Sequence, residues 1–261
     1  MIQVQGPSPI ALVGIAYGLA AAVAGAILWK TGRFSRHVKY AFLLVTLALG
    51  FAIFSPMLPY MFQELVLAAG SGAGAVILGA ALGMAAYILV VFLFSRHFCG
   101  YLCPVGAVQE LAYTVPSPKV KVPWKAVPQV ARGMVFVLVV VAGTAASLPV
   151  LHALGIRQFF TLAISAGFLA FLCLVLVSVF VYRPFCRFAC PPGVFFSLAA
   201  LGARWKIRRT GKCTGCGKCE EACPTGEAGK DALKGECYMC RRCVEACPVP
   251  GALVYGGEGD A

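Results

Sequence analysis

The chain has 261 residues, of which 60% are apolar and 12% are charged, and its formal net charge is +12. This composition excludes an ordinary soluble globular protein and predicts an integral membrane protein. Residues 1–212 hold 17 Lys and Arg against two acids, whereas residues 213–261 hold five bases against eight acids. Because the bases fall in short loops, they indicate membrane topology, and no nucleic-acid partner is expected.

Five apolar stretches are long enough to cross a bilayer at about 20 residues per span. They cover approximately residues 10–29, 40–58, 73–94, 132–149 and 160–182. The loops between them alternate between many and few Lys and Arg, and the loop at 59–72 has neither. By the positive-inside rule we expect a prokaryotic cytoplasmic membrane protein with its N-terminus outside and its C-terminal region in the cytoplasm. Without a basic leader, the first stretch is predicted to be a span rather than a cleaved signal peptide.

An internal repeat connects the middle stretches. Phe98-Cys99-x3-Cys103-Pro104 follows the third stretch, and Phe185-Cys186-x3-Cys190-Pro191 follows the fifth. Each motif ends a pair of apolar stretches, so stretches two and three are predicted to be a copy of stretches four and five. Parallel repeats of this kind pack about a pseudo-twofold axis along the membrane normal.

The two C-x3-C-P motifs form a second constellation of thiols. Cysteines at i and i+4 lie on one face of a helical turn, and the following proline ends or bends that turn. If the axis brings the two faces together, Cys99, Cys103, Cys186 and Cys190 can hold a metal or a further cluster. They can also form redox-active disulfides or relay electrons to the membrane. The alternative is that two small-residue turns were duplicated and their thiols merely pack.

Two matching runs of cysteine dominate the last third of the chain. They are Cys213-x2-Cys216-x2-Cys219-x3-Cys223-Pro224 and Cys237-x2-Cys240-x2-Cys243-x3-Cys247-Pro248. This is the bacterial ferredoxin spacing, in which the fourth cysteine of each run ligates the other 4Fe–4S cluster. The spacing predicts one cluster on Cys213, Cys216, Cys219 and Cys247, and a second on Cys223, Cys237, Cys240 and Cys243. A zinc ribbon or a disulfide framework is the weaker alternative, because zinc knuckles do not use this spacing.

These features predict an α-helical integral membrane protein of about five transmembrane helices with a small α+β ferredoxin domain of the double 4Fe–4S type in the cytoplasm. The predicted parts are a transmembrane domain over 1–194, a basic linker over 195–212, the ferredoxin domain over 213–255 and a flexible tail over 256–261. Residues 195–212 are apolar on one side and basic at the end. They are typical of an interfacial helix on an anionic leaflet, or of a plain basic flank to the last span.

A few polar residues in the membrane region are further candidates. His97, two residues before Cys99, is a weak candidate for a hydrogen bond to a quinone carbonyl, and a structural role is the more common one for such a histidine. Glu64 is the acid of the predicted outer side, where it either accepts a quinol proton or is simply solvated. Glu110 lies on the predicted inner side, and Arg96 and Lys125 are its expected partners.

Several spans, duplicated Phe-Cys-x3-Cys-Pro motifs and a double ferredoxin module together resemble the NapH/MauN-type membrane ferredoxins. They are also similar to the membrane-and-ferredoxin half of the NosR family. The resemblance implies electron transfer between the quinone pool, or a cytoplasmic ferredoxin-like donor, and a respiratory or maturation partner. It implies two 4Fe–4S clusters, with a quinone as a further candidate cofactor.

We therefore expect a membrane-bound electron-transfer subunit of a larger oxidoreductase complex, with redox proteins as its partners in the bilayer. Quinol oxidation is a candidate reaction, although the sequence shows no acid–base or nucleophile constellation. Two alternatives stay open. One is a maturation factor that reduces a metal or a thiol through the C-x3-C-P cysteines, and the other is an iron–sulfur redox sensor or scaffold.

Overall fold

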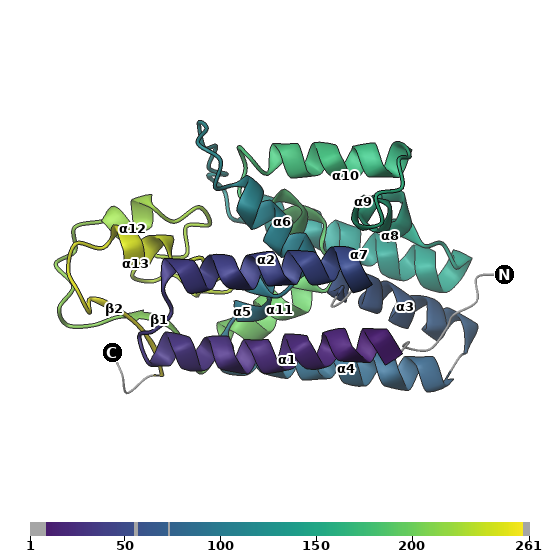
Figure 1. The fold of residues 1–261 in the computed structure, drawn as a ribbon, viewed down its shortest axis with the longest axis horizontal. Helices are drawn as coiled ribbons and strands as arrows, with labels where there is room; N and C mark the ends of the chain where they lie inside the picture. The colour runs from purple at the N-terminus through teal and green to yellow at the C-terminus, as the bar shows by residue number, and fades with distance from the viewer. Residues whose placement is uncertain (1–8, 55–56, 73, 258–261) are drawn as a thin grey trace.

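A computed structural model describes residues 9–54, 57–72 and 74–257. Helices lie side by side along one long axis, and a small lobe that contains the C-terminal cysteines covers one end of them (Figure 1). The four long helices are α1 (Pro9–Lys30), α2 (Arg36–Ile53), α4 (Gly74–Phe94) and α7 (Ala126–Ala146). Each is long and apolar enough to cross a membrane. They correspond to the first four predicted stretches, and they indicate membrane association.

The fifth predicted span, over 160–182, differs from the structure. Helix α10 covers Ala166–Val177, which is 12 residues. At 1.5 Å per residue it reaches about 18 Å, too short for a hydrocarbon core of about 30 Å. The chain before it forms the separate short helices α8 (Val150–Ala153) and α9 (Ile156–Phe160). Gly155 and Gly167 touch backbone to backbone, so the apolar run folds back on itself instead of crossing in one piece.

The region predicted as an outer loop at 59–72 is instead the helix α3 (Leu58–Ser71). Pro59 stands in its first turn, where a missing N–H costs nothing. Phe62 and Val66 are buried, and α3 packs against α4 and α7. A β-carbon on Gly143 of α7 would collide with Val66, so the two helices approach closely at this point. The absence of Lys and Arg therefore reflects a packed helix rather than a solvated loop.

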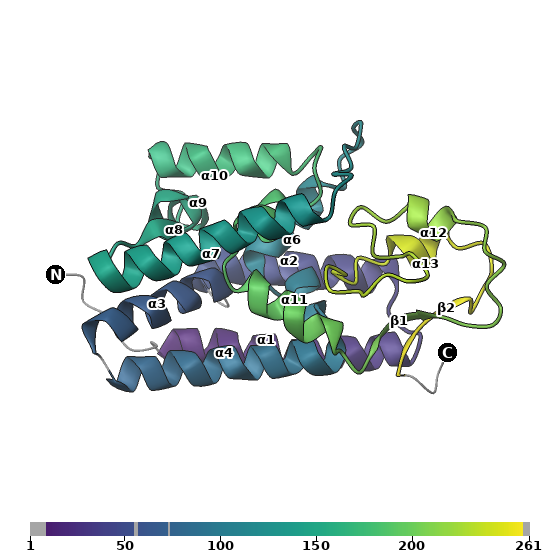
Figure 2. The same cartoon turned by 180° about the vertical axis from the view of Figure 1, so that it is seen from behind.

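The two C-x3-C-P motifs lie at equivalent turns. In the first repeat, α4 is followed by α5 (His97–Tyr101) and α6 (Pro104–Ala112). In the second, α10 is followed by a π-helical turn η1 (Phe185–Ala189) and α11 (Gly193–Leu201). Figure 2 shows α11 lying beside α4 and α7. Each proline after the motif starts a new direction of the chain, so both motifs sit at bends near the lobe.

The lobe consists of two strands and two short helices. Strand β1 (Lys206–Arg209) pairs antiparallel with β2 (Leu253–Gly256), and Ile207 lies opposite Tyr255. Helices α12 (Lys218–Glu221) and α13 (Arg242–Ala246) pack against each other. The predicted linker over 195–212 thus differs from the structure, because its first half belongs to the packed helix α11 and its second half supplies β1. The predicted flexible tail lies largely outside the described residues.

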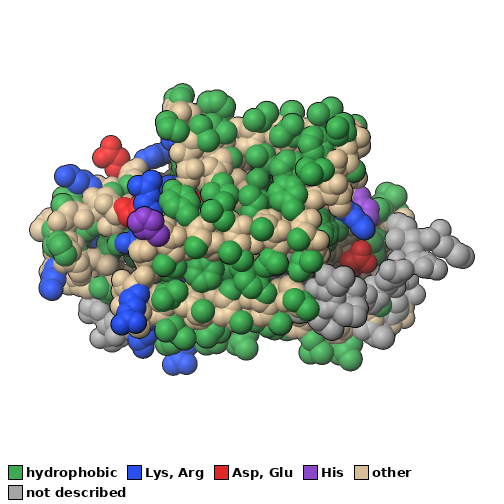
Figure 3. Space-filling model, viewed as in Figure 1, with side chains coloured by type: hydrophobic (Ala, Val, Ile, Leu, Met, Phe, Trp, Pro, Cys, Tyr) green, Lys and Arg blue, Asp and Glu red, His purple; other side chains and the backbone are tan. Residues whose placement is uncertain are grey.

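The surface of the molecule changes along its length. Figure 3 shows apolar side chains over the helices and Lys and Arg gathered at the end that carries the lobe. Leu82, Met134 and Leu169, on three different helices, are each more than half exposed. Apolar surface of this extent is unusual for a soluble monomer, so it agrees with helices that face lipid.

Candidate functional site

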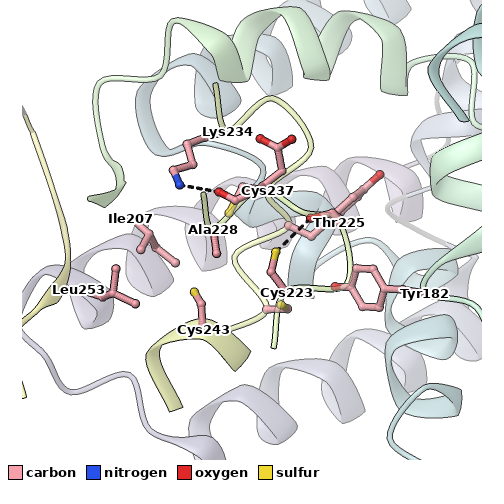
Figure 4. Close-up of a pocket in the computed structure, with 12 residues that line it drawn as sticks. Tyr182, Ile207, Cys223, Thr225, Ala228, Lys234, Cys237, Cys243 and Leu253 are labelled. Atoms are coloured by element: carbon pink, nitrogen blue, oxygen red, sulfur yellow. Dashed lines mark hydrogen bonds between the residues drawn. The ribbon is translucent and has the colours of Figure 1, made fainter. Parts of the chain in front are cut away.

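The structure gathers the eight C-terminal cysteines around two pockets. The first pocket is lined by Cys213, Cys216, Cys219 and Cys247. The second is lined by Cys223, Cys237, Cys240 and Cys243, and Figure 4 shows three of these cysteines around it with Tyr182 at its edge. This grouping is the same as the two ligand sets that the spacing predicts, with the fourth cysteine of each run crossing to the other pocket.

The backbone of each run is shaped to hold an anion. In the first run Gly215 and Gly217 have positive φ, and in the second Met239 and Arg241 do. Alternation of right-handed and left-handed residues turns successive N–H groups inward and forms an anion-binding concavity of the type found at iron–sulfur sites. The four cysteines and this backbone fit a 4Fe–4S cluster in each pocket, with thiolates as ligands and N–H groups toward the sulfides.

The two pockets differ in their surroundings. Cys216 is exposed, and the N–H of Lys218 lowers the pKa of its thiol. Pocket two is covered by Tyr182 and Tyr238, both buried. Burial raises the pKa of the Cys237 thiol to about 12, so this thiol ionises near neutral pH only when a metal replaces its proton. Pocket one faces solvent and pocket two faces the helices.

The four C-x3-C-P cysteines come together from the two repeats. Cys99 lies in α5 and Cys103 just before α6, while Cys186 lies in η1 and Cys190 just after it. Every pair among the four thiols is close enough for the charge of one to disfavour the charge of the other. We call these four residues the thiol tetrad. None of the 13 cysteines, all in the described part of the chain, forms a disulfide.

Two buried carboxylates connect the helices to the lobe. Glu236, next to Cys237, accepts from Arg96 Nη1 at 2.8 Å and from Arg132 Nη2 at 2.7 Å. Burial alone raises the pKa of Glu236, but the two guanidinium groups and Ser197 outweigh it and hold the pKa at about 2. Because Arg96 and Arg132 belong to the helical region and Glu236 to the lobe, these ion pairs fix the lobe in place.

Glu110 is the second of these carboxylates, and its partners are not the predicted ones. It pairs with Lys39 at 2.9 Å, Arg183 at 3.0 Å and Arg242 at 2.9 Å. Arg96 pairs with Glu236 instead, and Lys125 pairs with Glu227 at 3.1 Å. Burial alone raises the pKa of Glu110, but its three cationic partners hold that pKa well below the usual range. Partners more than 70 residues away in the chain could not be read from the sequence.

The loop between Cys237 and Cys240 is inserted against the tetrad. The Tyr238 hydroxyl donates to the Cys186 carbonyl at 3.3 Å, and the Tyr101 hydroxyl donates to the Met239 carbonyl. Gly100 touches the Tyr238 carbonyl so closely that a β-carbon there would overlap with it. The wall of pocket two and the turn that holds Cys99 and Cys103 are therefore in direct contact.

The remaining polar candidates lie away from any such contact. His97 is buried, with its ring between Phe34 and Tyr101 and against Gly25. Its Nδ1 has no hydrogen-bond partner among the described residues. A quinone would have to displace these rings to reach it. Glu64 lies half-buried on α3, in the electrostatic neighbourhood of Tyr60 and Arg157.

Several functional residues escaped the sequence analysis. They are Arg96 and Arg132 as partners of Glu236, Gln109 beside Cys186, and Tyr238 between the two sites. Arg132 carried a signal, since an ionisable residue at the edge of an apolar helix usually marks a paired or functional position. Tyr238 and Glu236 carried none, because their partners Cys186, Arg96 and Arg132 lie more than 50 residues away in the chain.

Comparison with known proteins agrees with this geometry. A family model described as a 4Fe-4S binding domain matches residues 76–123 and again residues 164–209, and a second such model matches residues 207–226. Each match of the first model begins in the second apolar stretch of one repeat and includes its C-x3-C-P motif. The third match covers the first ferredoxin-type run. No solved structure matches the chain.

Three curated relatives are similar to about half of the chain. The putative electron transport protein YccM of Escherichia coli is 28% identical over 162 residues, which cover 54% of this chain and 45% of the relative. An uncharacterized protein of Methanocaldococcus jannaschii is 34% identical over 142 residues, covering 52% and 54%. The methylamine utilization ferredoxin-type protein MauN of Methylobacillus flagellatus is 28% identical over 152 residues, covering 51% and 50%. The chain spans about half the length of these relatives, and the resemblance to membrane polyferredoxin-type proteins is confirmed.

Proposed function

We propose that this chain is a membrane-bound iron–sulfur protein that carries electrons through two 4Fe–4S clusters in its lobe. Cys213, Cys216, Cys219 and Cys247 would hold cluster one, and Cys223, Cys237, Cys240 and Cys243 would hold cluster two. The observation that carries the proposal is the pair of four-cysteine pockets with an anion-binding backbone. Each bound cluster supplies a one-electron redox couple, and the protein supplies its position, its access to solvent and its hydrogen bonds.

The proposal includes a direction in space. Cluster one lies beside the exposed Cys216, so a redox protein can approach it from solvent. Cluster two lies under Tyr182 and Tyr238, against the helices that we propose to cross the membrane. An electron would pass between a soluble or peripheral partner at cluster one and an acceptor or donor at the membrane side of cluster two. We propose that this second partner is a respiratory redox protein or the quinone pool.

The proposed topology follows from the charge of the two ends. Lys30, Arg33 and Arg36 are exposed at the end of the bundle that carries the lobe. At the far end, α3, α8 and α9 contribute Arg157 as their basic residue among the described residues. Loops rich in Lys and Arg stay in the cytoplasm. The lobe would therefore be cytoplasmic, and the N-terminus of α1 would lie outside. After the crossing by α7, the short helices α8, α9 and α10 would together return the chain to the cytoplasmic side.

Anaerobic purification in detergent tests the cofactor content. We expect about eight iron and eight sulfide per chain from the lobe, and a reduced EPR spectrum of interacting 4Fe–4S clusters. Cys216→Ser and Cys240→Ser should each weaken one cluster and leave the other. Reconstituted in liposomes, the protein should show cluster reduction by a quinol or by a low-potential ferredoxin. A lobe without iron, whose serine variants change nothing, would exclude the proposal.

The alternative function as a maturation factor requires accessible cysteines. A factor that reduces an outside thiol or metal ion needs the tetrad to be reachable, yet Cys99, Cys103 and Cys186 are each less than 10% exposed. Their burial favours electron transfer over exchange of sulfur bonds, since exchange requires direct attack by one sulfur on another. Rapid alkylation of these three cysteines in the native protein would reverse this preference.

A further inference from the structure

The thiol tetrad is a built site that the two clusters of the lobe do not use. It takes two cysteines from each repeat, at turns that contact each other through Arg183, which donates to the carbonyls of Cys99 and Gly100. All four thiols lie within electrostatic reach of one another. Two turns more than 80 residues apart in the chain bring four cysteines together here, so the site needs an explanation of its own.

Each sulfur of the tetrad has a donor or a cation beside it. Gln109 Nε2 donates to Cys186 Sγ at 3.4 Å, and the Arg96 guanidinium lies beside Cys99. Burial raises the pKa of all four thiols, and against this the N–H groups of Val105 and Gly106, at the start of α6, hydrogen-bond with the Cys103 sulfur. The N–H of Gly193, at the start of α11, does the same for Cys190. Donors aimed at sulfur stabilise thiolates and metal-bound sulfur, and such hydrogen bonds are the usual surroundings of cluster ligands.

The positive charge near the tetrad also favours a bound cluster. Where the helices meet the lobe, two buried carboxylates, Glu110 and Glu236, pair with five cations: Lys39, Arg96, Arg132, Arg183 and Arg242. The further pair of Lys125 with Glu227 is partly exposed and adds one charge of each sign. A surplus of buried positive charge is costly unless negative charge lies nearby. Four thiolates around a 4Fe–4S core of charge 2+ carry a net charge of about −2. Cluster two, with Cys240 beside Arg242, would balance part of this surplus. A cluster at the tetrad, beside Arg96 and Arg183, would balance the rest, whereas four neutral thiols would not.

The arrangement of the tetrad does not fit a single metal ion. Four thiolates on one ion at about 2.3 Å would lie less than about 4 Å from each other. Within residues 9–54, 57–72 and 74–257, no group of three or more Cys, His, Asp or Glu is arranged to hold one metal ion, neither in the tetrad nor in the pockets of the lobe. The thiolates of a cube lie farther apart, because each binds a different iron. In this respect the tetrad is like the two cysteine sets of the lobe.

We infer that Cys99, Cys103, Cys186 and Cys190 bind a third iron–sulfur cluster of the 4Fe–4S type, which exchanges electrons with cluster two. This inference rests on the proposed function, because it takes its electrons from the lobe. In the transfer, reduced cluster two gives up one electron and the third cluster gains it. No bond forms or breaks and no proton moves. The third cluster is the step between the lobe and the membrane partner.

The contact between the two sites supplies the route. Tyr238 follows Cys237 directly, its hydroxyl donates to the Cys186 carbonyl, and its ring lies 4.2 Å from the Arg96 guanidinium carbon. The Tyr238 carbonyl touches Gly100, which follows Cys99. One residue therefore joins a ligand of cluster two to both halves of the tetrad. No such contact connects pocket one, whose lining comes entirely from the lobe.

Metal and sulfide content tests the inference, with the full chain purified anaerobically. The wild-type chain should hold about 12 iron and 12 sulfide. The variant with Cys99, Cys103, Cys186 and Cys190 all changed to Ser should hold about eight of each and keep the EPR signals of the lobe. The matched variant Cys213→Ser/Cys219→Ser should instead lose the signal of cluster one and keep that of the third cluster. About eight iron in both wild type and the quadruple variant would overturn the inference and leave the proposed function standing.

A milder variant covers the case in which the quadruple variant fails to fold. Gln109→Leu removes the donor to Cys186 Sγ but none of the ligands. It should leave the iron content unchanged and shift one of three EPR signals and its midpoint potential. If every signal stays unchanged, or if anaerobic alkylation of the wild-type chain finds all four tetrad cysteines as free thiols, there is no third cluster. If the lobe itself lacks iron, the proposed function fails instead.

Discussion

The two cysteine pockets of the lobe come from the same repeated run, yet they now stand in opposite surroundings. Pocket one has glycines at both left-handed positions, Gly215 and Gly217, and it opens to solvent. Pocket two has Met239 and Arg241 at those positions and lies under the tyrosines of the helical region. The difference shows that two copies of one cysteine run can keep the same cysteines and still differ in their surroundings. One copy keeps a free face for a partner, and the other uses its loop residues to dock onto the bundle.

The docking of pocket two depends most on its buried ion pairs, so breaking one is the strongest test of the comparison. Glu110→Gln leaves Lys39, Arg183 and Arg242 without their carboxylate. Removal of one partner from a buried pair costs about 3–5 kcal/mol. We expect a large fall in the unfolding midpoint in detergent and loss of the cluster-two signal before that of cluster one.

The matched control for this change is Glu220→Gln, beside pocket one. Glu220 pairs with Arg209 but its side chain is half exposed, and such surface pairs contribute about 0–1 kcal/mol. Its unfolding midpoint should stay close to that of the wild type. If both variants lowered the unfolding midpoint equally, buried ion pairs would not be what distinguishes pocket two from pocket one.

The pH dependence of stability is a second test of the ion pairs of Glu110. The cationic partners of Glu110 hold its pKa well below the usual 4.5, against the effect of burial. A carboxyl whose pKa is lowered by folding contributes stability above its unfolded pKa and loses it as the pH falls toward the folded value. The difference in unfolding midpoint between wild type and Glu110→Gln should therefore be constant from pH 7 to 5 and shrink at pH 4. A difference that grows on acidification would contradict the ion-pair account.

The contact at Gly100 offers a smaller effect that falls on pocket two alone. Gly100→Ala places a methyl group on the Tyr238 carbonyl, and overlap with backbone costs about 1–3 kcal/mol. We expect the loop of pocket two to move away from the tetrad, so electron transfer between cluster two and the membrane side should slow by tenfold or more in freeze-quench EPR. Reduction of cluster one by a soluble donor should keep its rate. Gly133→Ala on α7, with open space around it, is the control and should change neither rate.

The sequence predicted the parts of this comparison that depend on local spacing. The two cysteine sets, the double C-x3-C-P motif and four of the long helices follow from repeats and hydropathy. It did not predict that 59–72 is a packed helix or that 160–182 holds only the short helix α10, which packs back against Gly155, since hydropathy does not separate buried from lipid-facing apolar residues. Nor did it give the partners of Glu110, which are brought together only by the tertiary fold. The cysteine ligand sets could be predicted from the sequence, and the contacts between the helices and the lobe could not.

The smallest expected effect on stability comes from the left-handed backbone positions of the two cysteine runs. It can be tested by exchanging the residues at these positions. Arg241 has φ +72° at the position where the first run has Gly217, with φ +74°. A left-handed conformation costs a non-glycine residue about 1–2 kcal/mol. Gly217→Arg should therefore destabilise the lobe by about 1 kcal/mol. Arg241→Gly should stabilise it by somewhat less, because the partly exposed ion pair with Glu245 is lost. Chemical unfolding of the two variants measures both signs. If Arg241→Gly instead destabilises the lobe by several kcal/mol, the Arg241 side chain contributes to the contact between the loop of pocket two and the helices. Pocket two would then depend on its loop even more than the ion pairs indicate.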